Sequence, residues 1–399
     1  AMRPVSIRWE LAMPDLLTAD GLDRLHEVAA AHVADDRIPG LAALVARGDQ
    51  VHVEALGTLS IGGPPVARDS LFRIASTSKP ITAAATLVLA GEGLFDLDEP
   101  VDRLLPELAN RRVLSRMDGP LGETVPADRP VTARDLLTFT FGFGMVLEMF
   151  TTPGPWPVVT EGERLRLGTF GPPRPESQPD PDTWIAALGS LPLIAQPGER
   201  WMYNTGASVL GVLAARAAGQ PFSEVLRTRI FEPLGMKDTG FWTAHTDRLA
   251  TAYMPTPDGL VVTDAPDGAW SKPQAFSDGA AGLVSTTDDL LAFARMLLRG
   301  GAPVLSAGAA RAMTTDQLTS AQKAHGGLGA DFFTGKSWSF GQAVHDSGAF
   351  GWAGGLGTTW MADPAKDLTI IVLTQRQFES SDTPAAHADI QAAAYAAVA

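Results

Sequence analysis

Serine and lysine stand three residues apart at two places in the chain, a spacing that can support nucleophilic catalysis. Ser76 and Lys79 belong to the run LFRIASTSKPITAAATLVLAGEG, and Ser320 and Lys323 belong to TTDQLTSAQKAHGG. Residues i and i+3 share one face of a helix, so each lysine amine would lie beside its serine hydroxyl. A neutral lysine there can accept the serine proton and make the oxygen a nucleophile.

The surroundings of the two pairs differ. Ser76 joins a strand-like segment to an apolar helix that begins near it, and a helix N-terminus favours negative charge. Apolar surroundings would desolvate Lys79 and lower its pKa. Lys323 lies among polar residues and would stay solvated and charged. The residues alone leave one alternative for the first pair, a serine N-cap beside a surface lysine.

Tyr203 is the tyrosine that we select as a second proton-transfer group. It stands in PGERWMYNTGASVLG, just before a helix, whereas Tyr253 follows an irregular loop and Tyr395 lies in a terminal Ala-rich helix. A phenol has a pKa of about 10, and a neighbouring lysine cation would lower that pKa. A purely structural aromatic is the alternative.

Other catalytic chemistries lack their motifs. The chain has no cysteine, which excludes thiol nucleophiles, disulfides and thiolate metal sites. Its seven histidines form no HxH, HxxxH or HExxH pattern, and neither a phosphate-binding loop nor the GxSxG elbow is present. We therefore expect no metal and no cofactor.

Composition limits the partners. The chain has 399 residues, 45% hydrophobic, and a net charge of −14, which disfavours nucleic acid and anionic membrane surfaces as partners. No apolar run approaches the roughly 18 residues of a membrane-spanning helix. The first residues, AMRPVSIRWELAMPD, show no leader pattern, so we expect a cytoplasmic protein. The oligomeric state stays open.

The pattern of elements predicts an α/β (α+β) fold. Strand-like runs occur near both ends, and helical runs fill the middle. The expected strands are 41–48 and 50–57, which form a hairpin, and 336–344, 357–363 and 368–376. The expected helices are 18–36, one from near Ser76 to Gly93, 206–219, 288–300 with Thr286 as N-cap, and one starting at Thr383-Pro384. We expect a sheet domain from residues 1–75 and 281–399, and a mainly helical domain from 76–280. The Pro-rich loop 146–182 is either a pocket wall or lid, or a surface insertion.

Several segments, taken in order, resemble one family. They are FRIASTSKP, VTARDLLTFTFGFG (131–144), PGERWMYNTGASVLGVLAARAAGQPFSEVLRTRIFEPLGMKDTGF (197–241) and GWAGGLGTTWMADPAKDLTIIVLTQ (351–375). The chain is similar to serine β-lactamase-fold proteins, nearest to class C enzymes and family VIII carboxylesterases. The resemblance implies an antiparallel sheet flanked by helices. It also implies a nucleophile, Ser76, and a general acid/base pair, Lys79 and Tyr203.

The resemblance assigns a third motif, Trp352-Ala353-Gly354, and an oxyanion hole built from the N–H groups of Ser76 and Gly355. His325-Gly326-Gly327 also spells that motif, but it comes too early in the chain. Lactamases of this fold carry Lys-[ST]-Gly there, whose cation holds a substrate carboxylate. Trp352 replaces the cation with an apolar wall, as in the esterases, and Thr205 stands where lactamases have asparagine. Both changes weaken the case for a β-lactam substrate.

Aromatic residues are candidates for an acyl pocket. Phe139 and Phe141 replace the histidine and serine of the family's HTSG segment. With Phe143, Phe150, Trp156 and Trp184 they line a pocket or pack in the core. We name Phe141, Trp156 and Trp352 as candidate substrate-binding residues.

The expected function is that of a serine carboxylesterase acting on small or apolar esters through an acyl-enzyme. A small-molecule ester is the expected partner. Four alternatives remain open: acyl transfer to another alcohol or amine, amide or peptide hydrolysis, weak β-lactamase activity, and a non-catalytic binding module.

Overall fold

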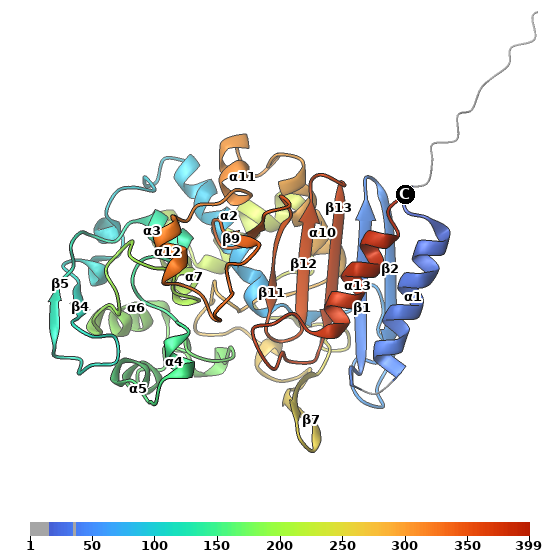
Figure 1. Ribbon diagram of the computed structural model, residues 1–399, viewed down its shortest axis with the longest axis horizontal. Coiled ribbons are helices and arrows are strands. Elements are labelled where there is room, and N and C mark those ends of the chain that lie inside the picture. The colour runs from blue at the N-terminus through green and yellow to red at the C-terminus, as the bar shows by residue number, and fades with distance from the viewer. Residues whose placement is uncertain (1–15, 35–36) are drawn as a thin grey trace, which may run out of the picture.

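A seven-stranded antiparallel sheet forms one side of the molecule (Figure 1). The computed structural model describes residues 16–34 and 37–399. The strand order is β2-β1-β13-β12-β11-β10-β9. The strands are β1 (Gly40–Arg47), β2 (Gln50–Gly57), β9 (Lys336–Trp338), β10 (Ala343–His345), β11 (Phe350–Gly354), β12 (Thr358–Asp363) and β13 (Leu368–Thr374). Because β1 pairs with β13, the two ends of the chain meet inside one sheet.

Helices cover both faces of this sheet. Leu41, Ala43 and Val45 of β1 pack with α1 (Ala19–Ala34) and α13 (Ala385–Ala396), which lie side by side in Figure 1. The alternate residues Ala42, Leu44 and Ala46 face the main core, which includes α10 (Thr287–Leu298). The run of apolar residues in β1 is continuous because both faces of the strand are buried. An antiparallel strand with one face exposed to solvent would instead alternate apolar and polar residues.

The other side of the molecule is mainly helical. The helix α2 (Ser78–Gly91) lies at its centre, packs on α7 (Thr205–Ala218), and is buried along its first ten residues. The remaining helices are α3 (Ala133–Thr138), α4 (Glu148–Thr151), α5 (Pro157–Arg164), α6 (Pro181–Ser190), α8 (Phe222–Leu226), α9 (Glu232–Leu234), α11 (Ala307–Met313) and α12 (Ser320–Ala324). Short turns of helix are η1 (Ala75–Thr77), η2 (Val101–Arg103), η3 (Pro106–Leu108), η4 (Pro175–Ser177), η5 (Arg227–Phe231) and η6 (Ala269–Ser271). Three strand pairs complete the fold: β3 (Phe72–Arg73) with β8 (Val284–Ser285), β4 (Arg112–Leu114) with β5 (Thr124–Pro126), and β6 (Ala252–Thr256) with β7 (Gly259–Asp264).

The predicted fold class is confirmed, and two element boundaries are corrected. The expected strand 336–344 is two strands, β9 and β10, because the chain turns back at Gly341, whose φ is +78°. The last helix begins at Ala385, with Pro384 at the N-cap position instead of the first helical position. The Thr286 cap is confirmed, since its side chain accepts from the Asp289 N–H.

The division into domains at 75/76 and 280/281 stays a prediction. Residues 1–15, on which the expectation of no leader rests, lie outside the described residues, as do residues 35–36 at the end of the expected first helix. Within the described part of the chain, no helix is both long and apolar enough to cross a membrane.

The sheet meets the turn η1 at a glycine. A Cβ added at Gly354 of β11 would lie 2.1 Å from the Ile74 carbonyl oxygen and 2.4 Å from Thr358 Oγ1. The Thr358 hydroxyl in turn donates to the same Ile74 carbonyl (3.0 Å). The backbone of β11 thus lies directly against the residue that precedes η1, with no room for a side chain.

We expect Gly354→Ala to destabilise the protein by about 1–3 kcal/mol, the usual range for overpacking. Gly355→Ala is the matched control, because a Cβ at Gly355 meets no atom within 4 Å. Urea unfolding of both variants measures the free energy of unfolding. Equal stability of the two would contradict the close approach of β11 to Ile74.

Candidate active site

Ser76 lies in η1, a turn held on both sides. The Ile74 N–H donates to the Leu283 carbonyl (2.9 Å), and the Leu283 N–H donates to Ser78 Oγ (3.2 Å). Ala75 adopts a left-handed conformation with φ of +45°. A non-glycine residue in that region costs on the order of 1–3 kcal/mol, so surrounding contacts must impose it. The turn therefore presents Ser76 in a fixed orientation at the start of α2.

Lys79 lies one helical turn after Ser76 and is fully buried. Its Nζ lies 2.8 Å from Ser76 Oγ and donates to the Ala280 carbonyl at 2.9 Å. Burial lowers the pKa of Lys79 to about 7, and the negative charge of Asp278 opposes that decrease. The decrease has the direction expected from apolar surroundings. Near neutral pH a large share of this amine is uncharged and able to accept a proton.

Tyr203 completes this cluster. It is 8% exposed, its hydroxyl accepts from Trp352 Nε1 (2.9 Å), and Lys79 Nζ lies 4.5 Å from its ring centre. Burial raises the pKa of Tyr203 to about 12, and hydrogen bonding to Ser76 and Trp352 only partly offsets this. The expectation of a lowered pKa is wrong, because desolvation outweighs the hydrogen bonds with Ser76 and Trp352. The phenol is therefore protonated and can donate its proton.

Two backbone N–H groups beside Ser76 are free to bind an anion. Within residues 16–34 and 37–399, neither the Ser76 N–H nor the Gly355 N–H has a hydrogen-bond acceptor. Both residues line one cavity. The Gly354 carbonyl, which shares a peptide with the Gly355 N–H, accepts from the Gly357 N–H (3.0 Å), and this bond fixes the orientation of that peptide. Paired N–H donors of this kind stabilise the oxyanion that forms when a carbonyl is attacked.

A cavity of about 660 Å³ opens above Ser76, Tyr203 and Trp352, with Lys79 buried beneath it. This volume suits a small organic molecule. Much of its wall is apolar: Met145, Phe150, Pro172, Pro173, Leu328, Phe332, Ala343 and Leu356. The wall also contains four titratable side chains besides Tyr203: Lys336, His345, Glu379 and Asp382.

The Pro-rich segment 146–182 contributes Phe150, Gly171, Pro172 and Pro173 to this wall, which is the geometry of a pocket wall and not of a plain surface insertion.

Two of the three candidate substrate-binding aromatic residues do not line the cavity above Ser76. Trp352 lines the cavity, but Phe141 (fully buried) and Trp156 (5% exposed) pack in the main hydrophobic core. Phe143 and Trp184 share that core, and Phe139 packs behind Tyr203. Aromatic rings gain more from complete burial than from a cavity wall in contact with water, so the geometry gives Phe141 and Trp156 no place in the pocket.

Asp278 is a residue of the site that sequence analysis missed. Its Oδ1 accepts from Ser208 Oγ (2.6 Å) and from the Ala280 N–H (2.9 Å). It thereby fixes the residue whose carbonyl accepts from Lys79, and its charge acts on that amine. Asp278 is about two hundred residues from Lys79 in sequence, and only its position in the apolar run QAFSDGAAGLV could have drawn attention to it.

Comparisons with known proteins agree with this geometry. The family model described as Beta-lactamase matches residues 25–394. The chain belongs to the Beta-lactamase family. It is 38% identical to Protein Rv1367c of Mycobacterium tuberculosis over 78% of this chain and 79% of that one. It is 32% identical to Esterase EstB of Burkholderia gladioli over 90% and 92%. The solved structure of EstCE1, "a hydrolase with promiscuous acyltransferase activity", superposes with a TM-score of 0.79 at 25% identity, covering 94% and 99%.

Within this Beta-lactamase family chain, the second Ser-x-x-Lys pair has a different environment. Ser320 and Lys323 lie in α12, and Lys323 Nζ pairs with Asp316 (2.7 Å). Neither residue lines the cavity above Ser76, and neither does any residue of the alternative motif His325-Gly326-Gly327. The structure thus brings only the first pair together with Tyr203.

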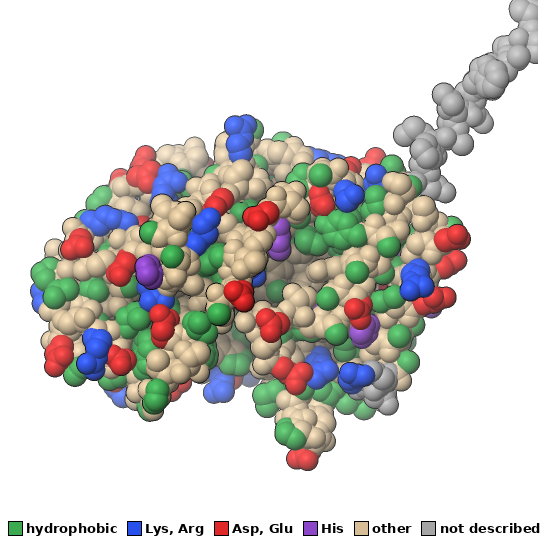
Figure 2. Space-filling view, viewed as in Figure 1, with side chains coloured by type: hydrophobic (Ala, Val, Ile, Leu, Met, Phe, Trp, Pro, Cys, Tyr) green, Lys and Arg blue, Asp and Glu red, His purple; other side chains and the backbone are tan. Residues whose placement is uncertain are grey.

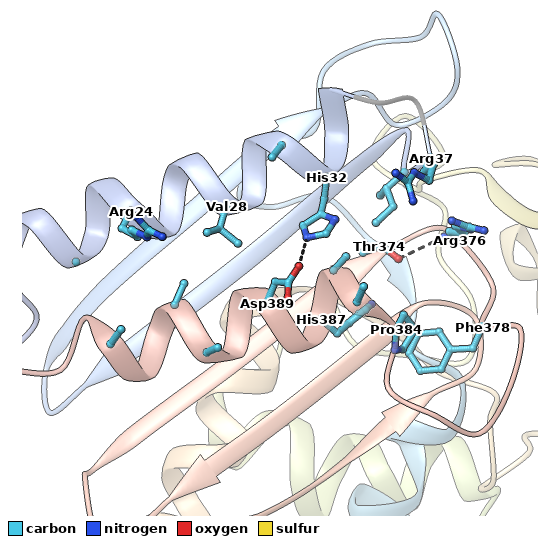
Figure 3. Close-up of a pocket in the computed structure, with 18 of the residues that line it drawn as sticks. Arg24, Val28, His32, Arg37, Thr374, Arg376, Phe378, Pro384, His387 and Asp389 are labelled. Carbon is cyan, nitrogen blue, oxygen red and sulfur yellow. Dashed lines mark hydrogen bonds and ion pairs between the residues drawn. The ribbon is translucent and has the colours of Figure 1, made fainter.

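A larger cavity of about 1080 Å³ lies between α1 and α13, away from Ser76 (Figure 3). Its labelled wall includes Arg24, His32 and Asp389, and His32 pairs with Asp389 (2.8 Å). Neither Ser76 nor Tyr203 borders it, so its size does not make it the candidate site. No group of three or more metal-ligating side chains in the described residues is arranged to hold a metal ion.

We expect Asp278→Asn to lower the pKa of Lys79 below its value of about 7. The substitution removes a charge that favours the ammonium, yet asparagine keeps an oxygen that can accept from Ser208 and Ala280. NMR titration of ¹³C-labelled lysine, with Lys79→Arg to assign the signal, measures the pKa. Ser208→Ala retains the charge and serves as control. An unchanged or raised pKa of Lys79 in Asp278→Asn would disprove the charge interaction.

Proposed function

We propose that this protein is a serine carboxylesterase that cleaves small or apolar esters through an acyl-enzyme on Ser76. One observation carries the proposal: a buried lysine with a pKa of about 7 lies 2.8 Å from the hydroxyl of a serine that faces an apolar cavity. The similarity to Esterase EstB and to the hydrolase EstCE1 supports an ester as the substrate class. A cytoplasmic location stays a prediction.

Acylation uses two proton transfers. Neutral Lys79 takes the proton of Ser76 as Oγ attacks the ester carbonyl, and the N–H groups of Ser76 and Gly355 bind the oxyanion. Tyr203, a phenol with a pKa of about 12, gives its proton to the departing alcohol oxygen. Trp352 Nε1 already donates to the Tyr203 oxygen (2.9 Å), so it stabilises the phenolate that remains. The Lys79 ammonium beside the ring stabilises the same charge.

Deacylation reverses both transfers. The Tyr203 phenolate takes a proton from water as the water oxygen attacks the acyl carbon. The Lys79 ammonium returns its proton to Ser76 Oγ as the carbon–oxygen bond breaks. The acid is released, and serine, amine and phenol regain their initial protonation states. This cycle needs no cofactor.

Acyl transfer is the second candidate, because an alcohol can take the place of water in deacylation without any change in the residues. The name of EstCE1 supports it. A β-lactam or a peptide is less well suited, because Trp352 offers the substrate no cation at the third motif. A non-catalytic binding module would not need a buried lysine in contact with Ser76.

We expect a fluorophosphonate to label Ser76 and Ser76→Ala to abolish both labelling and p-nitrophenyl ester hydrolysis. Lys79→Ala should lower kcat/KM by about 10²–10⁴-fold, the range for a general base. Lys323→Ala, at the second pair, is the matched control and should keep full activity. Intact-mass spectrometry and ester assays measure these effects. Labelling that survives Ser76→Ala, or no turnover by the parent chain, would favour the binding module.

Hydrolysis and acyl transfer can be distinguished by whether water or an added alcohol takes the acyl group from the same acyl-enzyme. With p-nitrophenyl butyrate as substrate, increasing concentrations of a primary alcohol should leave p-nitrophenol release unchanged if acylation limits the rate, and butyric acid should stay the main product. Chromatography of butyric acid and of the butyrate ester of the alcohol measures the ratio. If the acid dominates at every alcohol concentration, the esterase assignment stands. If the new ester dominates at millimolar alcohol, the protein is an acyltransferase.

A further inference from the structure

The wall of the cavity above Ser76 contains a cation with no hydrogen-bonding partner. Lys336 of β9 is half-buried, and its Nζ lies 4.3 Å from the centre of the Phe332 ring. Throughout the described residues, this amine makes no hydrogen bond and no ion pair. Lys323, by contrast, pairs with Asp316. A desolvated ammonium without a hydrogen-bonded counter-ion is unfavourable, so an oxygen anion within hydrogen-bond distance would stabilise Lys336.

The neighbours of Lys336 define that site. His345 lies directly opposite on β10 and lines the same cavity. Burial and the charge of Lys336 both lower the pKa of His345, so its ring is neutral at neutral pH and offers a hydrogen bond without a second charge. Two carboxylates, Glu379 and Asp382, also line the cavity, and Glu379 is already paired with Arg376 (2.9 Å).

Asp382 is the competing partner within the chain. Its charge favours the ammonium form of Lys336, yet the pKa of Lys336 is still lowered, because burial costs more than this attraction returns. Asp382 therefore does not compensate the buried amine. An oxygen anion that enters the cavity and accepts directly from Nζ would do so.

Lys336 and Ser76 line the same cavity, so one small substrate can contact both side chains. Phe332 contacts both the Lys336 ammonium and the ring of Trp352, whose indole donates to Tyr203. The chain carries a net charge of −14, and Figure 2 shows acidic side chains spread over the visible face among basic ones. An acidic protein repels anionic substrates at long range, so selection of one requires a local cation.

We propose that Lys336 binds a carboxylate carried by the substrate, so that the preferred esters are monoanions with an apolar body. This inference rests on the proposed esterase function and names its substrate class. The carboxylate occupies the wall formed by Lys336 and His345, the apolar body lies against Phe332, and the ester carbonyl reaches Ser76.

Two pairs of esters test the proposal. The first pair compares the mono-p-nitrophenyl ester of adipic acid with p-nitrophenyl hexanoate, so that the anion lies on the acyl side of the ester. The second pair compares 4-butyryloxybenzoate with phenyl butyrate, so that the anion lies on the alcohol side. In at least one pair, Lys336→Met should lower the preference for the anion in kcat/KM by about 10- to 100-fold, as expected for loss of a charged hydrogen-bond partner. The change should appear in KM, and kcat/KM should fall more for the anionic ester of the pair than for the neutral one.

Lys336→Arg should restore part of the preference. Lys366→Met, which removes an exposed lysine at the turn between β12 and β13, is the control and should leave the preference unchanged. Asp382→Asn should raise the preference, because it removes the competing carboxylate. If Lys336→Met leaves the ratio unchanged in both pairs while neutral esters are cleaved normally, the proposal is overturned and the esterase function stands.

A binding measurement tests the role of Lys336 independently of the esterase function, because it does not require an ester to be cleaved. Calorimetry on Ser76→Ala with monomethyl adipate and dimethyl adipate measures recognition without turnover. Tighter binding of the monoanion that is lost in Ser76→Ala/Lys336→Met supports the anion site even if the esterase proposal fails. Equal binding of the two compounds opposes it.

Discussion

The site depends on keeping a lysine amine out of water beside a serine hydroxyl. Lys79 is fully buried, and its pKa falls to about 7 from an ordinary 10.5. Between those two pH values the unfolded chain holds a proton that the folded chain does not. The free energy of unfolding therefore falls as the pH falls through that window. Burial of Lys79 therefore costs stability. It also leaves the amine partly uncharged near pH 7, so that it can accept a proton, whereas an exposed lysine would be protonated at that pH.

Burial of that amine requires the architecture around it. The helix α2 packs on α7 and hydrogen-bonds with the segment that ends at β8, where the Ala280 carbonyl accepts from Lys79. The sheet closes the other side, where Gly354 lies against Ile74. Segments far apart in the sequence, around Ile74, Ala280 and Gly354, thus meet beside Ser76 and Lys79. The strained residues on either side of the cluster, Ala75 with φ of +45° and Asn204 with φ of +88°, are consistent with such tight packing.

Sequence analysis predicted what is local and what the family motifs imply. The Ser76–Lys79 contact spans one helical turn, and the Thr286 cap spans three residues, so spacing alone indicates both. Tyr203 lies more than a hundred residues away, and only the resemblance placed it beside Ser76. Asp278 belongs to no motif and was missed. Phe141 and Trp156 were assigned to the pocket incorrectly, because an apolar ring has the same sequence signature in a core as in a cavity wall.

Trp352 bears on both the proposed proton transfer, through Tyr203, and the choice of substrate, because it replaces a cation. Lactamases of this fold are expected to carry a cation at its position, and here an indole N–H donates to the Tyr203 oxygen instead. The indole stabilises a phenolate without adding a full positive charge next to it, so recognition of substrate charge no longer depends on that position. The positive charge of the cavity lies instead on Lys336, at the outer strand β9, and the Phe332 ring contacts both this ammonium and Trp352. The residues proposed for catalysis, Ser76 and Lys79, lie in η1 and α2, whereas the proposed anion contact, Lys336, lies in β9. A substitution at one of these places need not alter the other.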